Sequence, residues 1–134
     1  MFESEVVSKV IDKLQQEGFR VLTEVSNMGQ SVDVVATRGK WVTFVEVKTR
    51  NWSRAMEQCE AHQQIADFIC IAIASVSVPA RLFEEATLNG YGLLHYRRVQ
   101  NDVVWIVRPR RNTDVWPPQR KYWAAATRKV AYAN

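Results

Sequence analysis

The chain lacks the features on which several protein classes depend. Its two cysteines, Cys59 and Cys70, match neither a zinc-site spacing nor a disulfide framework. No stretch approaches the run of about 18 apolar residues that a membrane span needs. The first five residues, Met-Phe-Glu-Ser-Glu, lack the charged and apolar regions of a signal peptide. We therefore expect a soluble protein in a reducing, cytoplasmic setting, without a membrane partner.

The residue patterns of several enzyme classes are also missing. The five glycines form no phosphate-binding loop, and the serines have no accompanying His-Asp arrangement. The two histidines, His62 and His95, have no paired ligands in the sequence. We therefore assign neither histidine as a metal ligand or as a general base.

Positive charge is concentrated at the carboxyl end. The 134 residues suit a single packed domain with a net charge of +4. Residues 108–134 hold seven basic residues and one acid, whereas residues 1–107 hold eleven basic and thirteen acidic residues. We therefore divide the chain into a domain of residues 1–107 and a basic, aromatic extension of residues 108–134. A basic extension favours a polyanionic partner.

Hydrophobic periodicity predicts an α/β fold with a central sheet. Helices are predicted over residues 2–17, 52–64 and 79–89, and strands over residues 19–25, 31–37, 41–48, 68–74, 91–97 and 103–107. The fourth predicted strand is apolar throughout, which indicates an interior strand covered on both faces. After Pro109 the periodicity fades, and no further element is predicted.

Three ionisable side chains are embedded in two apolar strands that the tight turn 38–40 joins: Asp33, Glu46 and Lys48. Side chains alternate between faces along a strand, so Glu46 and Lys48 share one face. If the two strands pair, Asp33 comes close to Glu46, and the two carboxylates repel each other until a cation bridges them. A hard divalent ion such as Mg²⁺ suits that arrangement. The alternative is a surface hairpin with a Glu–Lys pair.

The stretch from Asp33 to Lys48 resembles the D-x(n)-(D/E)-x-K signature of PD-(D/E)XK, or restriction-endonuclease-like, nucleases. Asp33 is followed by twelve residues and then by Glu46-Val-Lys48, although Val32 stands where the signature has proline. The α-β-β-β-α-β order of residues 2–74 is similar to the core of that superfamily. The first helix, Gly18-Phe19 and the segment 32–36 are most similar to archaeal Holliday-junction resolvases and Mrr-type endonucleases.

The resemblance implies metal-assisted hydrolysis of phosphodiester bonds in DNA. Asp33 and Glu46 would bind Mg²⁺, with Mn²⁺ as a substitute, and Lys48 would orient or activate the attacking water. Duplex or branched DNA is the expected partner, and RNA stays open. Nucleases of this size often act as homodimers that cut both strands, although no residue here identifies an interface. The alternative function is a catalytically silent, nuclease-like module that binds nucleic acid or protein.

Two further residues are candidates for the catalytic site. These nucleases often add an acid from the first helix, and helical geometry places Glu3 on the same stripe as Val10 and Leu14. A frayed glutamate that complements the helix dipole is the alternative. Family members also often place a glutamine on the second helix. Gln58 is the best match there, with an exposed amide as the alternative.

Basic side chains in two regions are candidates for nucleic-acid binding. Arg50 and Arg54 follow the catalytic strand closely enough to hold a phosphate, with solvated helix charges as the alternative. In the extension the candidates are Arg110, Arg111, Arg120 and Lys121. Aromatic residues lie among them, which suits backbone neutralisation combined with base stacking. The alternative is that these aromatic residues pack on their own domain or on a dimer partner.

Overall fold

The computed structural model describes residues 2–27 and 29–133, with side chains up to Thr127. The helices are α1 (Glu3–Gln16), α2 (Trp52–Ala61), α3 (Ala80–Asn89) and α4 (Pro117–Ala133). The strands are β1 (Arg20–Asn27), β2 (Gln30–Arg38), β3 (Trp41–Lys48), β4 (Phe68–Ile73), β5 (Gly92–Arg97) and β6 (Asp102–Val107). Met28, between the first two predicted strands, lies outside the described residues.

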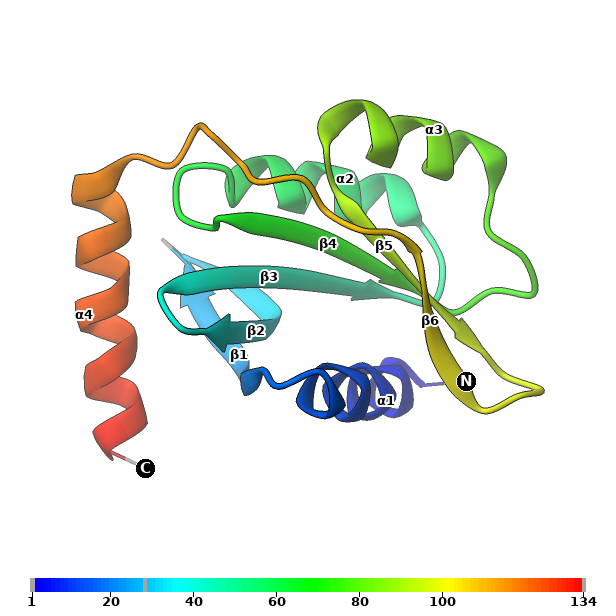
Figure 1. Cartoon of the computed structure of the whole chain (residues 1–134), viewed down its shortest axis with the longest axis horizontal. Coiled ribbons are helices and arrows are strands. Elements are labelled where there is room, and N and C mark those ends of the chain that lie inside the picture. The colour runs from blue at the N-terminus through cyan, green and yellow to red at the C-terminus, as the bar shows by residue number, and fades with distance from the viewer. Residues whose placement is uncertain (1, 28, 134) are drawn as a thin grey trace.

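All six strands form one mixed sheet in the order β1-β2-β3-β4-β5-β6 (Figure 1). The first three strands form an antiparallel meander, β3, β4 and β5 run parallel, and β6 returns antiparallel to β5. The left-handed Gly39, with φ of 60°, allows the tight connection between β2 and β3. This arrangement confirms the predicted α/β fold and its restriction-endonuclease-like core.

Helices cover both faces of the sheet (Figure 1). On one face α1 buries Val6, Val10 and Leu14, which recur every four residues along the helix. On the opposite face α2 and α3 pack over a core that includes Phe44 and Ile71. Glu46 and Lys48 follow Phe44 at two-residue intervals along β3, so their side chains are directed to the face that α2 covers.

The extension crosses the face that α2 and α3 cover and ends in a helix beside β1 (Figure 1). The Arg110, Asn112 and Trp116 amides donate to carbonyls of residues 90, 67 and 64. Trp123 is 5% exposed, lies 5.1 Å from the Phe44 ring and donates from Nε1 to the Ser26 carbonyl. Residues 108–127 are therefore packed onto the domain. This agrees with the alternative in which aromatic residues of the extension pack on their own domain, although Trp116 and Tyr122 are exposed.

The sequence-based prediction was wrong for α4, where no further element was expected. The helix begins with Pro117 and Pro118, because proline is tolerated in the first turn of a helix, where backbone N–H groups have no intrahelical acceptor. Alanine and other helix-favouring residues then continue the helix to Ala133. None of the described helices has the length and apolar character needed to span a bilayer.

Candidate functional site

Asp33 and Glu46 meet where β2 and β3 separate. The ladder between these strands ends at the pair Val34 and Val45, so residues 33 and 46 are the next opposing positions. Instead of a backbone carbonyl, the Asp33 Oδ2 atom accepts the Val47 N–H at 2.8 Å. The carboxylate of Asp33 therefore takes the place of a ladder bond and lies against β3.

Burial and the neighbouring acid hold Glu46 in its protonated form. Glu46 is fully buried. Burial is the main cause that raises its pKa to about 9, and the charge of Asp33 and a direct carboxyl–carboxyl contact add to the shift. The positive charge of Lys48 acts in the opposite direction, and Glu3 raises the pKa slightly further. Among the predicted site residues, the charges of Asp33, Lys48 and Glu3 all shift the pKa of Glu46.

A buried histidine also contacts Glu46, and the sequence analysis missed it. His62, at the end of α2, is fully buried, and its Nε2 lies 2.7 Å from Glu46 Oε1. Its Nδ1 lies 2.8 Å from the Asn27 Nδ2 amide. Burial lowers the pKa of His62 to about 4, so the ring is neutral near pH 7. The helical spacing from Ala55 and Cys59 places residue 62 on the buried stripe of α2. A buried polar side chain needs a hydrogen-bond partner. A histidine at this buried spacing is therefore the sequence feature that could have identified His62.

Asp33 and Glu46 each have one carboxyl oxygen in a hydrogen bond to another group of the protein. Asp33 uses Oδ2 for the Val47 amide, and Glu46 uses Oε1 for His62. Glu46 Oε2 is buried and accepts no hydrogen bond from the described residues. A buried carboxylate oxygen without a donor is costly unless a proton or a cation satisfies it. The pair therefore fits a divalent cation.

Two carboxylates suit Mg²⁺ better than a metal that needs a complete protein cage. Among the described residues, no cluster of three or more His, Cys, Asp and Glu side chains is arranged to hold an ion. Mg²⁺ usually keeps several waters and takes one or two carboxylates together with substrate phosphates. Asp33 and Glu46 are the residues that would hold it.

A polar pocket of about 630 Å³ contains the second-helix candidates. Its lining residues come from the start of β2 and the first turns of α2: Gln30, Ser31, Asn51, Ser53, Arg54, Glu57 and Gln58. Gln58 Oε1 is buried and accepts no hydrogen bond from the part of the chain that the structure describes. Arg50 and Arg54 are both exposed. Arg54 thus lies in the same pocket as the glutamine predicted for the site.

The arginines of the extension are held by the protein itself. Arg120 pairs with Asp67 at 2.9 Å and also donates to the carbonyls of Ile65 and Lys40. Arg110 donates to the carbonyls of Thr87 and Leu88 at the end of α3. Arg111 lies over the Trp41 ring at 4.8 Å.

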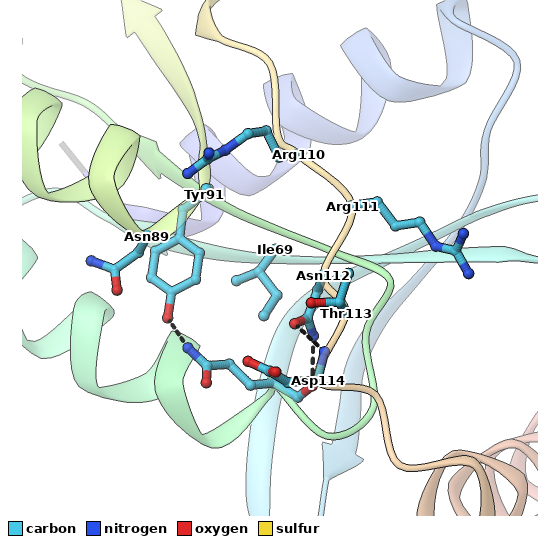
Figure 2. A pocket seen from close by; sticks show the side chains of 10 residues that line it. Ile69, Asn89, Tyr91, Arg110, Arg111, Asn112, Thr113 and Asp114 are labelled. Atoms are coloured by element: carbon cyan, nitrogen blue, oxygen red, sulfur yellow. Dashed lines mark hydrogen bonds between the residues drawn. The ribbon is translucent and has the colours of Figure 1, made fainter.

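A second pocket, of about 270 Å³, lies away from Asp33 and Glu46. Ile69 and Tyr91 line it near the amino ends of β4 and β5. Lys48 lies at the carboxyl end of β3, which runs parallel to them, and is therefore at the opposite edge of the sheet. In Figure 2 the Arg111 side chain points away from this pocket, and Tyr91 lies across from Asn112. The Tyr91 hydroxyl accepts from Gln63 Nε2 at 2.8 Å. We therefore place the candidate site at Asp33 and Glu46 and not here.

Proteins of solved structure share this fold. A protein of unknown function from Silicibacter pomeroyi matches with a TM-score of 0.69 and 18% identity, over 99% of this chain and 90% of that one. An XisH family protein from Nostoc punctiforme matches with 0.57 and 18%, over 76% and 98%. An fdxN element excision controlling factor protein from Anabaena variabilis matches with 0.54 and 19%, over 78% and 97%. No protein-family model matches the sequence, and no curated protein does.

Proposed function

We propose that this protein is a Mg²⁺-dependent endonuclease that hydrolyses phosphodiester bonds in DNA. The nuclease-like fold supports this proposal. The observation that supports it most strongly is the buried Glu46 Oε2, which receives no hydrogen bond from the described residues and lies in a carboxyl group that contacts Asp33. Asp33 and Glu46 are proposed as the metal ligands. A bound Mg²⁺ would supply Lewis-acid activation of the phosphoryl oxygen and of a water.

Lys48 is proposed to orient the attacking water and to stabilise the negative charge that develops on the phosphate. Lys48 lies two residues after Glu46 on the same face of β3, and its positive charge acts on Glu46. Arg54 and Gln58 line the polar pocket between the start of β2 and the first turns of α2, where a guanidinium can hold a phosphate through two parallel hydrogen bonds. Glu3 is proposed to add negative charge at the margin of the site.

A cleavage panel tests the proposal directly. The substrates are single-stranded, duplex and branched DNA together with RNA, each incubated with Mg²⁺, with Mn²⁺ or with a chelator. We expect divalent-dependent cleavage of DNA, and the panel identifies the preferred substrate form. Salt-sensitive DNA binding without cleavage in either metal would support a catalytically silent module instead.

Arg54 is expected to contribute a phosphate contact. Replacing it with alanine should weaken binding about equally across DNA sequences. It should also reduce the slope of log K against log salt by about 0.9, the value for one lost contact to duplex DNA. The measurement is DNA binding over a series of salt concentrations. Arg54→Ala is combined with Asp33→Asn, which is expected to prevent cleavage of the bound DNA. Arg81→Ala is the control, because Arg81 is 80% exposed on α3 and pairs with Glu85. Equal slopes for the two variants would remove Arg54 from the interface.

The raised pKa of Glu46 predicts that Mg²⁺ stabilises the protein more as the pH rises. Folding raises this pKa from 4.5 to about 9, so in the metal-free protein its contribution to stability is complete below pH 4.5 and is lost as the pH rises toward 9. Mg²⁺ replaces the proton and offsets that loss. Melting temperatures with and without Mg²⁺ should therefore differ more at about pH 8.5 than at about pH 6. The Glu46→Gln variant should not show this pH dependence. A larger Mg²⁺ effect at the lower pH contradicts the assignment.

A further inference from the structure

We infer that His62 is a positioning residue that fixes Glu46 for cation binding, and that Asn27 in turn fixes the ring of His62. This inference rests on the proposed metal-dependent function. It adds two residues, from β1 and from the end of α2, that do not touch the metal or the substrate. The three side chains form one buried chain of hydrogen bonds from Asn27 through His62 to Glu46.

The hydrogen-bond partners determine which ring nitrogen carries the hydrogen. The Asn27 Nδ2 amide is a donor, so it requires His62 Nδ1 to accept. The hydrogen of the neutral ring then lies on Nε2, which donates to Glu46 Oε1 at 2.7 Å. Proteins commonly orient an imidazole in this way: a hydrogen bond to one ring nitrogen determines whether the other nitrogen carries the hydrogen.

The consequence for Glu46 is that its two oxygens are no longer equivalent. His62 occupies Oε1, whereas Oε2 is buried and receives no hydrogen bond from the described residues. A carboxylate held by one oxygen loses the freedom to rotate its other oxygen away from a ligand. Glu46 Oε2 is therefore presented beside Asp33 at a fixed orientation, which lowers the entropic cost of binding a cation.

The packing around His62 keeps the ring in place. Phe44 meets it edge-to-face with ring centroids 5.0 Å apart, and the His62 carbonyl accepts from the amides of Ile65 and Ala66. Because the neighbouring backbone and the ring are both fixed, the position of Nε2 is fixed too. His62 therefore links the core beneath α2 to the acid on β3.

Substitutions that keep or remove the N–H donor test the inference. His62→Leu fills much of the same space but cannot donate to Glu46, whereas His62→Gln keeps an amide N–H that can. The control is His95→Leu, because His95 is also buried and donates from Nε2 to the Ser75 carbonyl, away from Glu46. The measurement is direct Mg²⁺ and Mn²⁺ affinity in the absence of DNA, by calorimetry and by Mn²⁺ electron paramagnetic resonance.

We expect His62→Leu to bind the cation about 10- to 100-fold more weakly than wild type, as is usual when a hydrogen-bond partner of a metal ligand is lost. His62→Gln should recover most of that loss, and His95→Leu should bind as the wild type does. Wild-type affinity in a folded His62→Leu protein would overturn the inference while leaving the proposed function intact. Absence of cation binding in the wild type would overturn both.

A second measurement decides the question if His62→Leu does not fold. Long-range ¹H–¹⁵N spectra of the wild-type protein with saturating Mg²⁺ report the tautomer of each histidine. We expect the neutral Nε2–H form for His62, and Asn27→Ala should weaken cation binding in the same direction as His62→Leu. An Nδ1–H tautomer, or unchanged affinity in Asn27→Ala, contradicts the proposed role.

Discussion

Replacing Lys48 with alanine is expected to lower the rate of DNA cleavage by about 10³-fold, equivalent to about 4 kcal/mol of transition-state stabilisation. Lys48 follows Glu46 by two residues on the same face of β3, and its positive charge lowers the pKa of Glu46. Its loss should leave substrate binding largely unchanged, because the expected role is in the chemical step. Single-turnover cleavage at saturating Mg²⁺ separates the two effects.

Asp33→Asn is the companion variant, because it removes the charge while an amide oxygen can still accept the Val47 N–H. A loss of similar size is expected. The control is Lys40→Ala, since Lys40 is exposed and lies in the turn between β2 and β3. If Lys48→Ala and Asp33→Asn both cleave at the wild-type rate, the catalytic assignment is wrong.

Trp123→Ala is expected to destabilise the protein by about 3–5 kcal/mol, the usual cost of truncating a large aromatic side chain in a core. Trp123 is almost fully buried against Phe44, and its indole N–H donates to the Ser26 carbonyl. The substitution therefore removes packing, a hydrogen bond and the anchor of α4 together. Chemical denaturation followed by circular dichroism gives the free energy of unfolding.

The neighbouring residue provides the matched control. Tyr122 is 67% exposed, so Tyr122→Ala should change the free energy of unfolding by no more than about 0.5 kcal/mol. Equal effects of the two substitutions would show that the extension is not part of the folding unit. A large difference would show that residues 1–107 do not hold the complete core.

The sequence predicted the order of nine elements because each has a clear local pattern. The α1 helix has apolar residues every four positions, β4 is apolar on both faces, and Gly39 marks a tight turn. The same local logic failed for α4, because the hydrophobic periodicity fades after Pro109 and no element was predicted there. Proline excludes a helix interior but not a helix start, and sequence alone does not tell these cases apart.

The candidate site could be predicted only where its residues are close in the sequence. Glu46 and Lys48 share a strand, and one turn separates them from Asp33, so alternation and pairing bring them together. The contact of Glu46 with His62 depends on how α2 lies on the sheet, and the contact of His62 with Asn27 joins residues 35 positions apart. Similarly, the pairing of Arg120 with Asp67 depends on the path of the extension. Such contacts are set by tertiary packing.

The most direct test of a shared cation between Asp33 and Glu46 is an anomalous difference map from crystals grown with Mn²⁺. We predict a peak that contacts both carboxylates, on the side of Glu46 that carries Oε2. A peak elsewhere, with none between these two residues, would contradict the account of the site.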